Sequence, residues 1–232
     1  MKTRGFTLVE LLVALSVMAL LALLSWQGVD SMTRTQSQIS ERQEANGVLR
    51  SSLAQWKTDL DAAVSKAPNL PSQAGPMDWN GLVFRLVRHA PPGATQGWRV
   101  VAWARMEVGG VAHWARWQSA PLIDQAGLQQ AWQQAERWAQ NPGNDPQVLA
   151  LLPAEQMQLF YARDGVWVNP LSSGNTSPSS ATNPTNPNPS AISPASTAPD
   201  GVRLILNLPA SVQGGGRILS DWAQPTLTGG KS

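Results

Sequence analysis

The chain opens with a long apolar run, which is followed by a polar stretch and then by an amphipathic one. Phe6–Leu24 is an apolar block of 19 residues in which Glu10 is the only charged side chain. As a helix it would span roughly 28 Å, about the thickness of the hydrocarbon core of a bilayer. No proline precedes Pro68. The pattern therefore predicts one long helix, with a membrane half over 6–29 and a second half over 30–67.

The second half of this predicted helix carries an apolar stripe. Its members recur at steps of three and four residues: Leu49, Leu53, Trp56, Leu60 and Val64. Such spacing is typical of a helix that packs one face against a globular core. Asp59 and Asp61 stand two residues apart and point in different directions, so we interpret both as solvent-exposed and not as a metal site. We therefore expect this half to lie on a folded head.

After Pro68 the helical period gives way to short alternating runs separated by proline and glycine. Two turn signals, at 107–110 and at Asp164-Gly165, join neighbouring runs as hairpins. Consecutive hairpins favour an antiparallel sheet, so the expected fold class is α+β, with the long helix packed on an antiparallel head over 68–168. An amphipathic stretch predicts a helix inserted at 126–140. The expected strands are 82–88, 98–105, 111–118, 157–163, 166–168 and 202–208.

Residues 169–200 differ in composition from the rest of the chain. They are rich in Pro, Asn, Ser and Thr, and no charged residue lies between Leu171 and Pro199. Such a tract cannot bury enough apolar surface to offset the entropy of ordering it. We therefore expect a disordered loop over 169–200, followed by final strands and a tail over 201–232.

Composition excludes several classes of function. The chain of 232 residues has no cysteine, which removes disulfides, thiolate metal sites, iron–sulfur clusters and a catalytic thiol. Its formal charge of +2 lacks the excess of basic residues that is typical of proteins that bind nucleic acid. The two histidines, His89 and His113, have no acidic or hydroxyl residue at a spacing that would indicate a catalytic pair. The sequence also contains no phosphate-binding loop and no nucleophile elbow. We predict no catalytic residue, no metal and no cofactor.

Tryptophan is the one unusual component, with 11 residues in the chain. Several cluster in the middle third, and two interpretations remain open for them: packing in the core, or a surface that binds a partner protein. The candidates for a partner surface are Trp103, Trp114, Trp117, Trp132 and Trp138.

Three interpretations compete for the N-terminus. A secretory signal peptide fits poorly, because the apolar run is long and contains Glu10. A plain membrane anchor accounts for the length, but an acid inside a spanning segment is costly and usually implies a partner. Lys2 and Arg4 precede the block, which favours a cytoplasmic N-terminus and delivery of the remaining chain across the membrane. The third interpretation rests on the local motif.

Lys2-Thr3-Arg4-Gly5-Phe6-Thr7-Leu8-Val9-Glu10 resembles the processing site of the type IV prepilin and pseudopilin family. The resemblance implies that a prepilin peptidase cuts between Gly5 and Phe6, removes the leader 1–5 and methylates the new amine of Phe6. Because the cut precedes the hydrophobic block, the anchor would stay on the mature chain. The family role of the glutamate implies that Glu10 pairs with the amine of a neighbouring subunit and aids its recruitment. The alternative is that Glu10 pairs with the amine of its own chain.

Later segments resemble the J-type minor pseudopilins of type II secretion, among them 26–32, 53–64, 81–85 and 202–206. That resemblance implies a bacterial inner-membrane protein with a single span, a cytoplasmic N-terminus and a periplasmic head. Its implied partners are the I- and K-type minor pseudopilins, the major pseudopilin and inner-membrane lipid. The alternatives are a minor pilin of a type IV pilus or DNA-uptake apparatus and, as a different class, a membrane-anchored periplasmic enzyme or binding domain.

Overall fold

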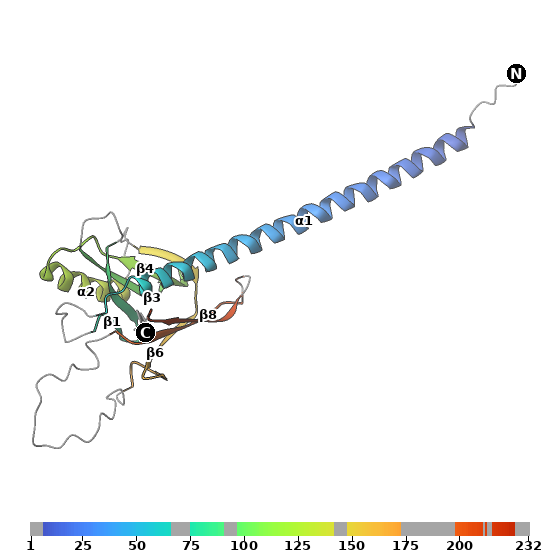
Figure 1. Ribbon diagram of the computed structural model, residues 1–232. Coiled ribbons are helices and arrows are strands. Elements are labelled where there is room, and N and C mark those ends of the chain that lie inside the picture. The colour runs from blue at the N-terminus through green and yellow to red at the C-terminus, as the bar shows by residue number, and fades with distance from the viewer. Residues whose placement is uncertain are drawn as a thin grey trace, which may run out of the picture. The chain divides into compact units, whose positions relative to one another are not determined.

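The computed structural model describes residues 7–65, 75–90, 97–141, 148–172, 198–210, 212 and 215–225 (Figure 1). It contains a long helix, a second helix and nine strands in these ranges. The elements are α1 (Leu8–Asp61), β1 (Met77–Trp79), β2 (Val83–His89), β3 (Trp98–Val108), β4 (Val111–Gln118), α2 (Gln125–Gln140), β5 (Val148–Pro153), β6 (Gln156–Arg163), β7 (Val166–Val168), β8 (Gly201–Leu208) and β9 (Gly216–Ala223). The fold is α+β with an antiparallel head, as the sequence predicted.

The chain divides into two compact units, Met1–Asn46 and Gly47–Ser232. The described part of the first unit is the N-terminal stretch of α1, where every side chain from Thr7 to Glu44 is exposed. The second unit is the head, which also contains the last turns of α1. This helix ends at Asp61, six residues before the predicted boundary, because Ala63 leaves it to form a β-bridge with Arg88 of β2.

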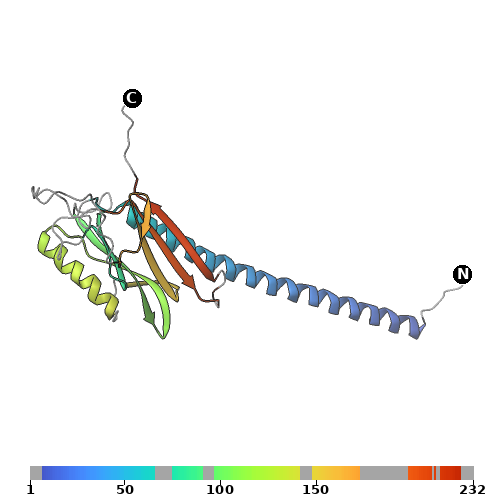
Figure 2. The ribbon, with the colours of Figure 1, turned by 90° about the horizontal axis from the view of Figure 1, so that it is seen from below.

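The head has two antiparallel sheets, where the sequence predicted one sheet (Figure 2). Sheet one has the order β1-β2-β3-β4-β5, and sheet two has the order β7-β6-β8-β9. The hairpin between β3 and β4 turns at Gly109 and Gly110, which have φ values of +61° and +79°. Two consecutive positive φ values suit a tight hairpin turn and favour glycine at both positions.

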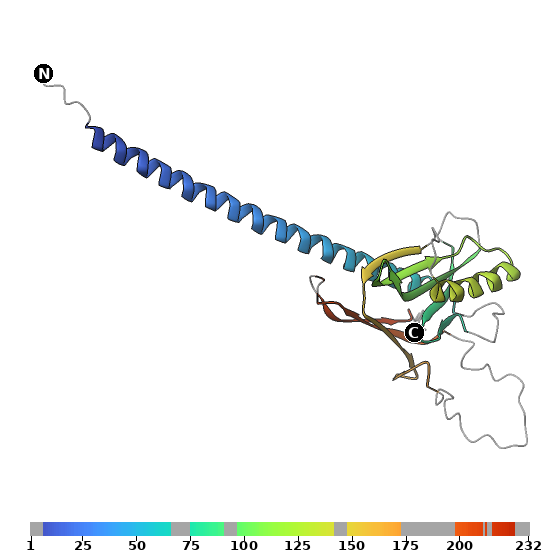
Figure 3. The same ribbon diagram turned by 180° about the vertical axis from the view of Figure 1, so that it is seen from behind.

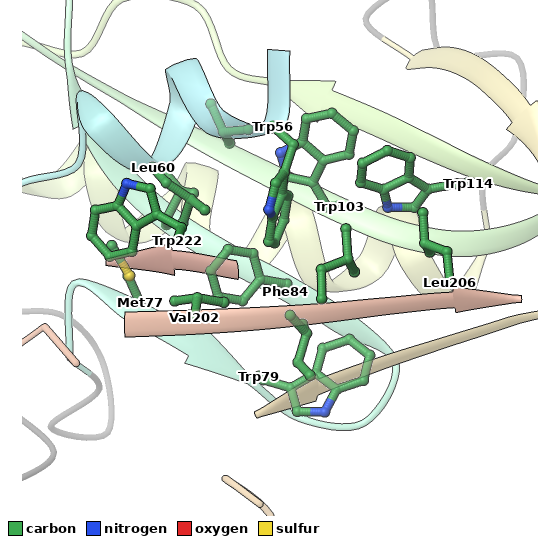
Figure 4. Close-up of a cluster of buried hydrophobic side chains, with 14 of the residues drawn as sticks. Trp56, Leu60, Met77, Trp79, Phe84, Trp103, Trp114, Val202, Leu206 and Trp222 are labelled. Atoms are coloured by element: carbon green, nitrogen blue, oxygen red, sulfur yellow. The ribbon is translucent and has the colours of Figure 1, made fainter. Parts of the chain in front are cut away.

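The larger core lies between the two sheets and is closed by the last turns of α1 (Figure 4). Trp56 and Leu60 of α1 reach into it, as the apolar stripe predicted, and both are almost fully buried. Leu49 and Leu53 of the same stripe pack against its margin. Sheet one contributes Phe84, Leu86, Val101, Trp103 and Trp114, and sheet two contributes Leu159, Tyr161, Val202, Leu204 and Leu206.

A second core lies on the opposite face of sheet one, between that sheet and α2 (Figure 3). Strand β3 serves both cores, because alternate side chains point to opposite faces. Val101 and Trp103 enter the larger core, whereas Val100, Ala102 and Ala104 face α2. Helix α2 begins with a cap in which the amide of Gly127 donates to Asp124 Oδ1 at 2.6 Å. Sheet one is therefore covered on both faces.

Candidate functional site

The start of α1 is built by a reciprocal pair of side chains, Thr7 and Glu10. The amide and the hydroxyl of Thr7 donate to Glu10 Oε2 at 3.4 and 3.3 Å, and the amide of Glu10 donates to Thr7 Oγ1 at 3.4 Å. This arrangement is a capping box, in which each side chain satisfies an amide that the first turn of a helix leaves unpaired. The carboxylate also lies at the positive end of the helix dipole.

Gly5 and Phe6, the predicted cleavage and methylation positions, lie outside the described residues. The cut between them and the methylation of Phe6 therefore stay predictions of the sequence motif. Glu10, the predicted assembly residue, is described and exposed, and its described contacts are with Thr7 of the same chain. Thr7 had no role in the sequence analysis, although the spacing Thr-x-x-Glu before an apolar run is a recognisable cap signal.

The first turns of α1 are apolar on all sides. From Leu8 to Leu24 every side chain is exposed, and Glu10 is the only charged one. This is the one helix in the described ranges that is long and apolar enough to cross a membrane. Beyond the apolar stretch, Trp26 is 74% exposed. Asp30 and Arg34 form an ion pair there at 3.0 Å. An exposed apolar helix of this kind suits membrane anchoring.

Residues 1–26 match the family model described as the prokaryotic N-terminal methylation motif. The matched segment contains Gly5, Phe6 and Glu10, and it supports the type IV prepilin and pseudopilin family. The motif implies processing by a prepilin peptidase. Proteins of this family are generally structural subunits and not enzymes. No curated protein matches the chain.

The five tryptophans considered as a partner surface are buried in the head, which corrects that interpretation. Trp103, Trp114 and Trp117 are 0% exposed, and Trp132 and Trp138 are 3% and 4% exposed. Their alternative, packing in the core, is what the structure contains. The physical reason is strand alternation in β3 and β4, which turns every one of these side chains on sheet one toward a covered face.

The indoles divide between the two cores. Trp56, Trp103 and Trp114 form one cluster, with ring centroids 5.4 Å apart for Trp56 and Trp103 and 4.4 Å apart for Trp103 and Trp114. In the second core, the ring centroids of Trp117 and of Trp138 from α2 are 6.5 Å apart. Aromatic contacts at these separations add to the stabilisation from burial. Tryptophan here therefore serves mainly to fill the head.

A buried carboxylate joins α1 to sheet one, which corrects the prediction that Asp59 is solvent-exposed. Asp59 is 0% exposed. The indole of Trp103 and the guanidinium of Arg116 donate to Oδ2 at 3.0 and 2.7 Å. Oδ1 accepts from Gln55 at 3.1 Å, from Arg116 at 2.9 Å and from Arg88. Helical spacing alone could not reveal this arrangement, because the three sheet residues come from three different strands.

The outer face of sheet two carries an exposed tryptophan of the head. Trp167 of β7 is 36% exposed, and the guanidinium of Arg203 lies 4.3 Å from its ring centroid. Arg203 is also held by both carboxylate oxygens of Asp221 at 2.7 Å. The hydrogen bonds from Arg203 hold the pKa of Asp221 below its ordinary value. Trp167, Arg203 and Asp221 thus form a row of contacts on the surface, in which the two opposite charges neutralise each other.

The contact described for the ring of His113 is with the backbone. His113 Nδ1 lies 2.9 Å from the carbonyl oxygen of Val111, two residues earlier in β4. Within the described ranges, no group of three or more His, Asp or Glu side chains could hold a metal ion. The candidate site of this chain is its N-terminal segment, because this segment carries the methylation motif, the Thr7–Glu10 cap and the exposed apolar start of α1.

Proposed function

We propose that this chain is a minor pseudopilin of a type II secretion system, of the J type. Its head joins the I- and K-type minor pseudopilins in a tip complex, which primes assembly of the major pseudopilin for export of proteins across the outer membrane. The observation that carries the proposal is the methylation motif at 1–26, which includes the exposed apolar start of α1 from Leu8 to Leu24. A large head with two sheets and the insert α2 favours a minor over a major subunit.

The first step is processing. Prepilin peptidase cleaves the bond between Gly5 and Phe6 and methylates the amine of Phe6. Glycine suits the cleavage position because no Cβ hinders close approach of the enzyme to the backbone. Cleavage removes Lys2 and Arg4, so the side chains of the mature chain sum to zero formal charge, with 15 basic and 15 acidic residues.

The second step is anchoring. The apolar half of α1 lies in the inner membrane, with its N-terminus on the cytoplasmic side and the head in the periplasm. The basic residues Lys2 and Arg4 before the block support this orientation in the precursor. Trp26 and the Asp30–Arg34 pair follow the apolar stretch, where amphipathic and charged groups can reach the headgroups and water.

The third step is recruitment through charge. The ammonium on Phe6 and the carboxylate of Glu10 on a neighbouring subunit both lie at the margin of an apolar medium. Opposite charges that are poorly solvated prefer pairing to isolation. Glu10 thus supplies both affinity and register for the next subunit. Pairing of Glu10 with the amine of its own chain would give no such link between subunits.

The experiment that tests this function compares Glu10→Gln with the wild type in the host that carries the secretion genes. Glu10→Gln keeps the size of the side chain and removes its charge. We expect normal cleavage, reduced co-isolation with the I- and K-type subunits and loss of export. Glu41→Gln is the matched control, because Glu41 is an exposed acid on the same helix beyond the apolar stretch.

Normal export from Glu10→Gln would contradict the pairing step. Co-isolation of the wild-type chain with pilus subunits, in place of the I- and K-type subunits, would move it to a minor pilin of a type IV pilus or DNA-uptake apparatus. A chain that is never cleaved and binds neither set would point to a membrane-anchored periplasmic protein of another kind.

A further inference from the structure

We propose that β9 is an open strand edge of the head, to which a neighbouring subunit of the assembly adds a strand of its own. The inference rests on the proposed function and names the surface through which the head would bind that subunit. The added strand carries an acidic side chain opposite Arg217 and an apolar one opposite Leu219. Strand β9 and its neighbour β8 are the red strands of Figure 2.

The edges of the two described sheets differ in how well they could pair with a further strand. Strands β1 and β7 have three residues each. Strand β5 has an irregular register against β4 and ends at Pro153, which has no amide hydrogen to offer a partner. Short strands, irregularities and proline are ordinary means by which proteins keep an edge from pairing. Strand β9 has eight residues, a regular register against β8 and no proline, so it remains a template for a further strand.

The alternation of the ladder decides which backbone groups of β9 are free. The amide of Gln224 donates to the carbonyl of Asp200 at 2.7 Å, just beyond the last β8–β9 pair. On the other side of β8, the carbonyl of Asn207 accepts from the amide of Glu155 at 2.8 Å. Even-numbered residues of β9 are therefore bonded to β8, and the amides of the odd-numbered ones point away from it.

The outward-pointing groups of β9 are open to pairing. The residues that carry them are all exposed: Arg217, Leu219, Asp221 and Ala223. Within the described ranges, no hydrogen bond is made by their outward amides and carbonyls. An added strand could bond to these groups without displacing any described part of the head. In such strand addition the backbone supplies affinity, and the side chains on either side supply specificity.

The outer face of β9 indicates the chemistry of the added strand. Asp221 is already paired, because Arg203 donates to both of its carboxylate oxygens at 2.7 Å. Arg217 is exposed, and in the described part of the chain its guanidinium forms no ion pair. The edge thus presents an uncompensated positive charge, and opposite charges directly across a strand pair are stabilising. Leu219, which is 53% exposed, offers apolar surface two residues further on.

Contacts of β9 with the end of α1 favour a neighbouring subunit as the source of this strand. The indole of Trp222 donates to Asp61 Oδ1 at 2.7 Å. Gln224 donates to the hydroxyl of Ser65 at 3.4 Å, just beyond the helix. Under the proposed function, subunits assemble through their N-terminal helices from one membrane. The parts of the heads that adjoin the helix ends then come side by side.

The test compares proline and alanine at one position of the full chain in the native host. Leu219→Pro removes an amide that points outward, so it should block pairing and leave the head folded. Leu219→Ala truncates the same side chain and keeps the amide. The measurement is the amount of I- and K-type subunits co-isolated with the chain. We expect a fall of about tenfold for Leu219→Pro, in line with the loss of a backbone hydrogen bond, and of less than about threefold for Leu219→Ala.

Two further comparisons check the backbone and the charge. Ser220→Pro is the matched folding control, because its amide is bonded to β8; it should lower the unfolding temperature, whereas Leu219→Pro should not. Equal destabilisation by the two would overturn the inference, since the amide of Leu219 would then belong to the ladder with β8. Arg217→Glu should lower co-isolation about threefold, and Arg217→Lys should restore it. Unchanged co-isolation from Arg217→Glu would overturn the acidic contact.

The remaining outcomes separate this inference from the proposed function. Equal co-isolation from the wild type and from Leu219→Pro would overturn the inference and leave the proposed function intact. A wild-type chain that co-isolates with neither subunit would overturn the proposed function. Recovery of a second copy of this chain, lost with Leu219→Pro, would overturn the inference as well, because the edge would then serve self-association.

Discussion

The indole of Trp103 donates a hydrogen bond to Oδ2 of Asp59 at 3.0 Å, which ties strand β3 to the last turns of α1. Both side chains are 0% exposed. The same carboxylate accepts from Arg88 of β2 and from Arg116 of β4. One acid on the helix therefore meets three adjacent strands of sheet one, and this fixes both the position and the rotation of the helix end within the head.

Asp59→Asn should destabilise the head strongly. The substitution removes the negative charge that compensates two largely buried guanidinium groups, those of Arg88 and Arg116. Removing one partner of a buried ion pair costs about 3–5 kcal/mol. The measurement is urea unfolding of the full chain in detergent, followed by tryptophan fluorescence. Glu107→Gln is the matched control, because Glu107 is exposed at the end of β3; equal unfolding midpoints for the two variants would contradict the role of Asp59.

Trp114→Ala should lower the unfolding free energy of the head much more than Trp167→Ala. Trp114 is fully buried between α1 and the two sheets, so its truncation should cost about 3–5 kcal/mol of unfolding free energy. Trp167 is 36% exposed on the outer face of sheet two, and its truncation should cost markedly less. The measurement is thermal unfolding by circular dichroism. A head that tolerates Trp114→Ala and still melts at the wild-type temperature would contradict the packing role of this cluster.

Patterns among residues close together in the sequence were sufficient to predict much of the fold. The apolar stripe of α1 predicted its packing on the head, and the glycines at 109–110 and 165 predicted two hairpins. The helix α2 begins one residue before its predicted start. These features depend on residues close together in the sequence, where helical or alternating periodicity is a direct physical signal.

Features that depend on tertiary pairing could not be predicted in the same way. Strands β1 and β5 are absent from the sequence prediction, and β9 lies within the predicted final strands at 201–232, which were given no bounds beyond 202–208. The sequence of β5 is an unbroken apolar run without alternation, and such a run does not distinguish a strand from a buried helix segment. The prediction for Asp59 was wrong, since its burial depends on arginines 29 and 57 residues away in the chain. The Thr7–Glu10 cap is a different case, because its spacing is local and the sequence alone contains the signal for it.

Gly5→Ala should slow processing of the precursor. A methyl group on the cleavage-site residue obstructs close approach of the peptidase to the backbone, and it also narrows the conformations available to the scissile segment. We expect the uncleaved chain, beginning at Met1, to accumulate in membranes while the head stays folded. Intact mass spectrometry of the extracted protein measures the ratio of precursor to mature chain. A fully mature, methylated chain starting at Phe6 in this variant would contradict the assignment of the cleavage position.

Replacement of residues 173–197 by a short Gly/Ser linker should leave the stability of the head nearly unchanged. The composition of this tract gives it little apolar surface to bury, so few stabilising contacts would be lost. Shortening a loop changes its closure entropy only slowly with length. The measurement is the unfolding temperature of the full chain with and without the replacement. A drop comparable to that of a core substitution would mean that the tract is part of the folded head.

Ionisation of the Tyr161 phenol should destabilise the head at alkaline pH. Burial raises the pKa of its phenol well above the ordinary value, with a smaller contribution from the nearby charge of Asp78. A group whose pKa is raised by folding contributes its full stabilisation below the unfolded pKa, about 10 for tyrosine, and loses it as the pH rises above that value. We therefore expect unfolding free energy to fall above about pH 10.

The chain makes this prediction easy to measure, because Tyr161 is its only tyrosine. Absorbance of the phenolate then reports one group, and its ionisation should coincide with loss of the folded signal in circular dichroism. Tyr161→Phe should remove this part of the alkaline sensitivity without weakening the head at neutral pH, since the buried hydroxyl has no hydrogen-bond partner in the described structure. Ionisation near pH 10 in a head that remains folded would show instead that the phenol reaches water.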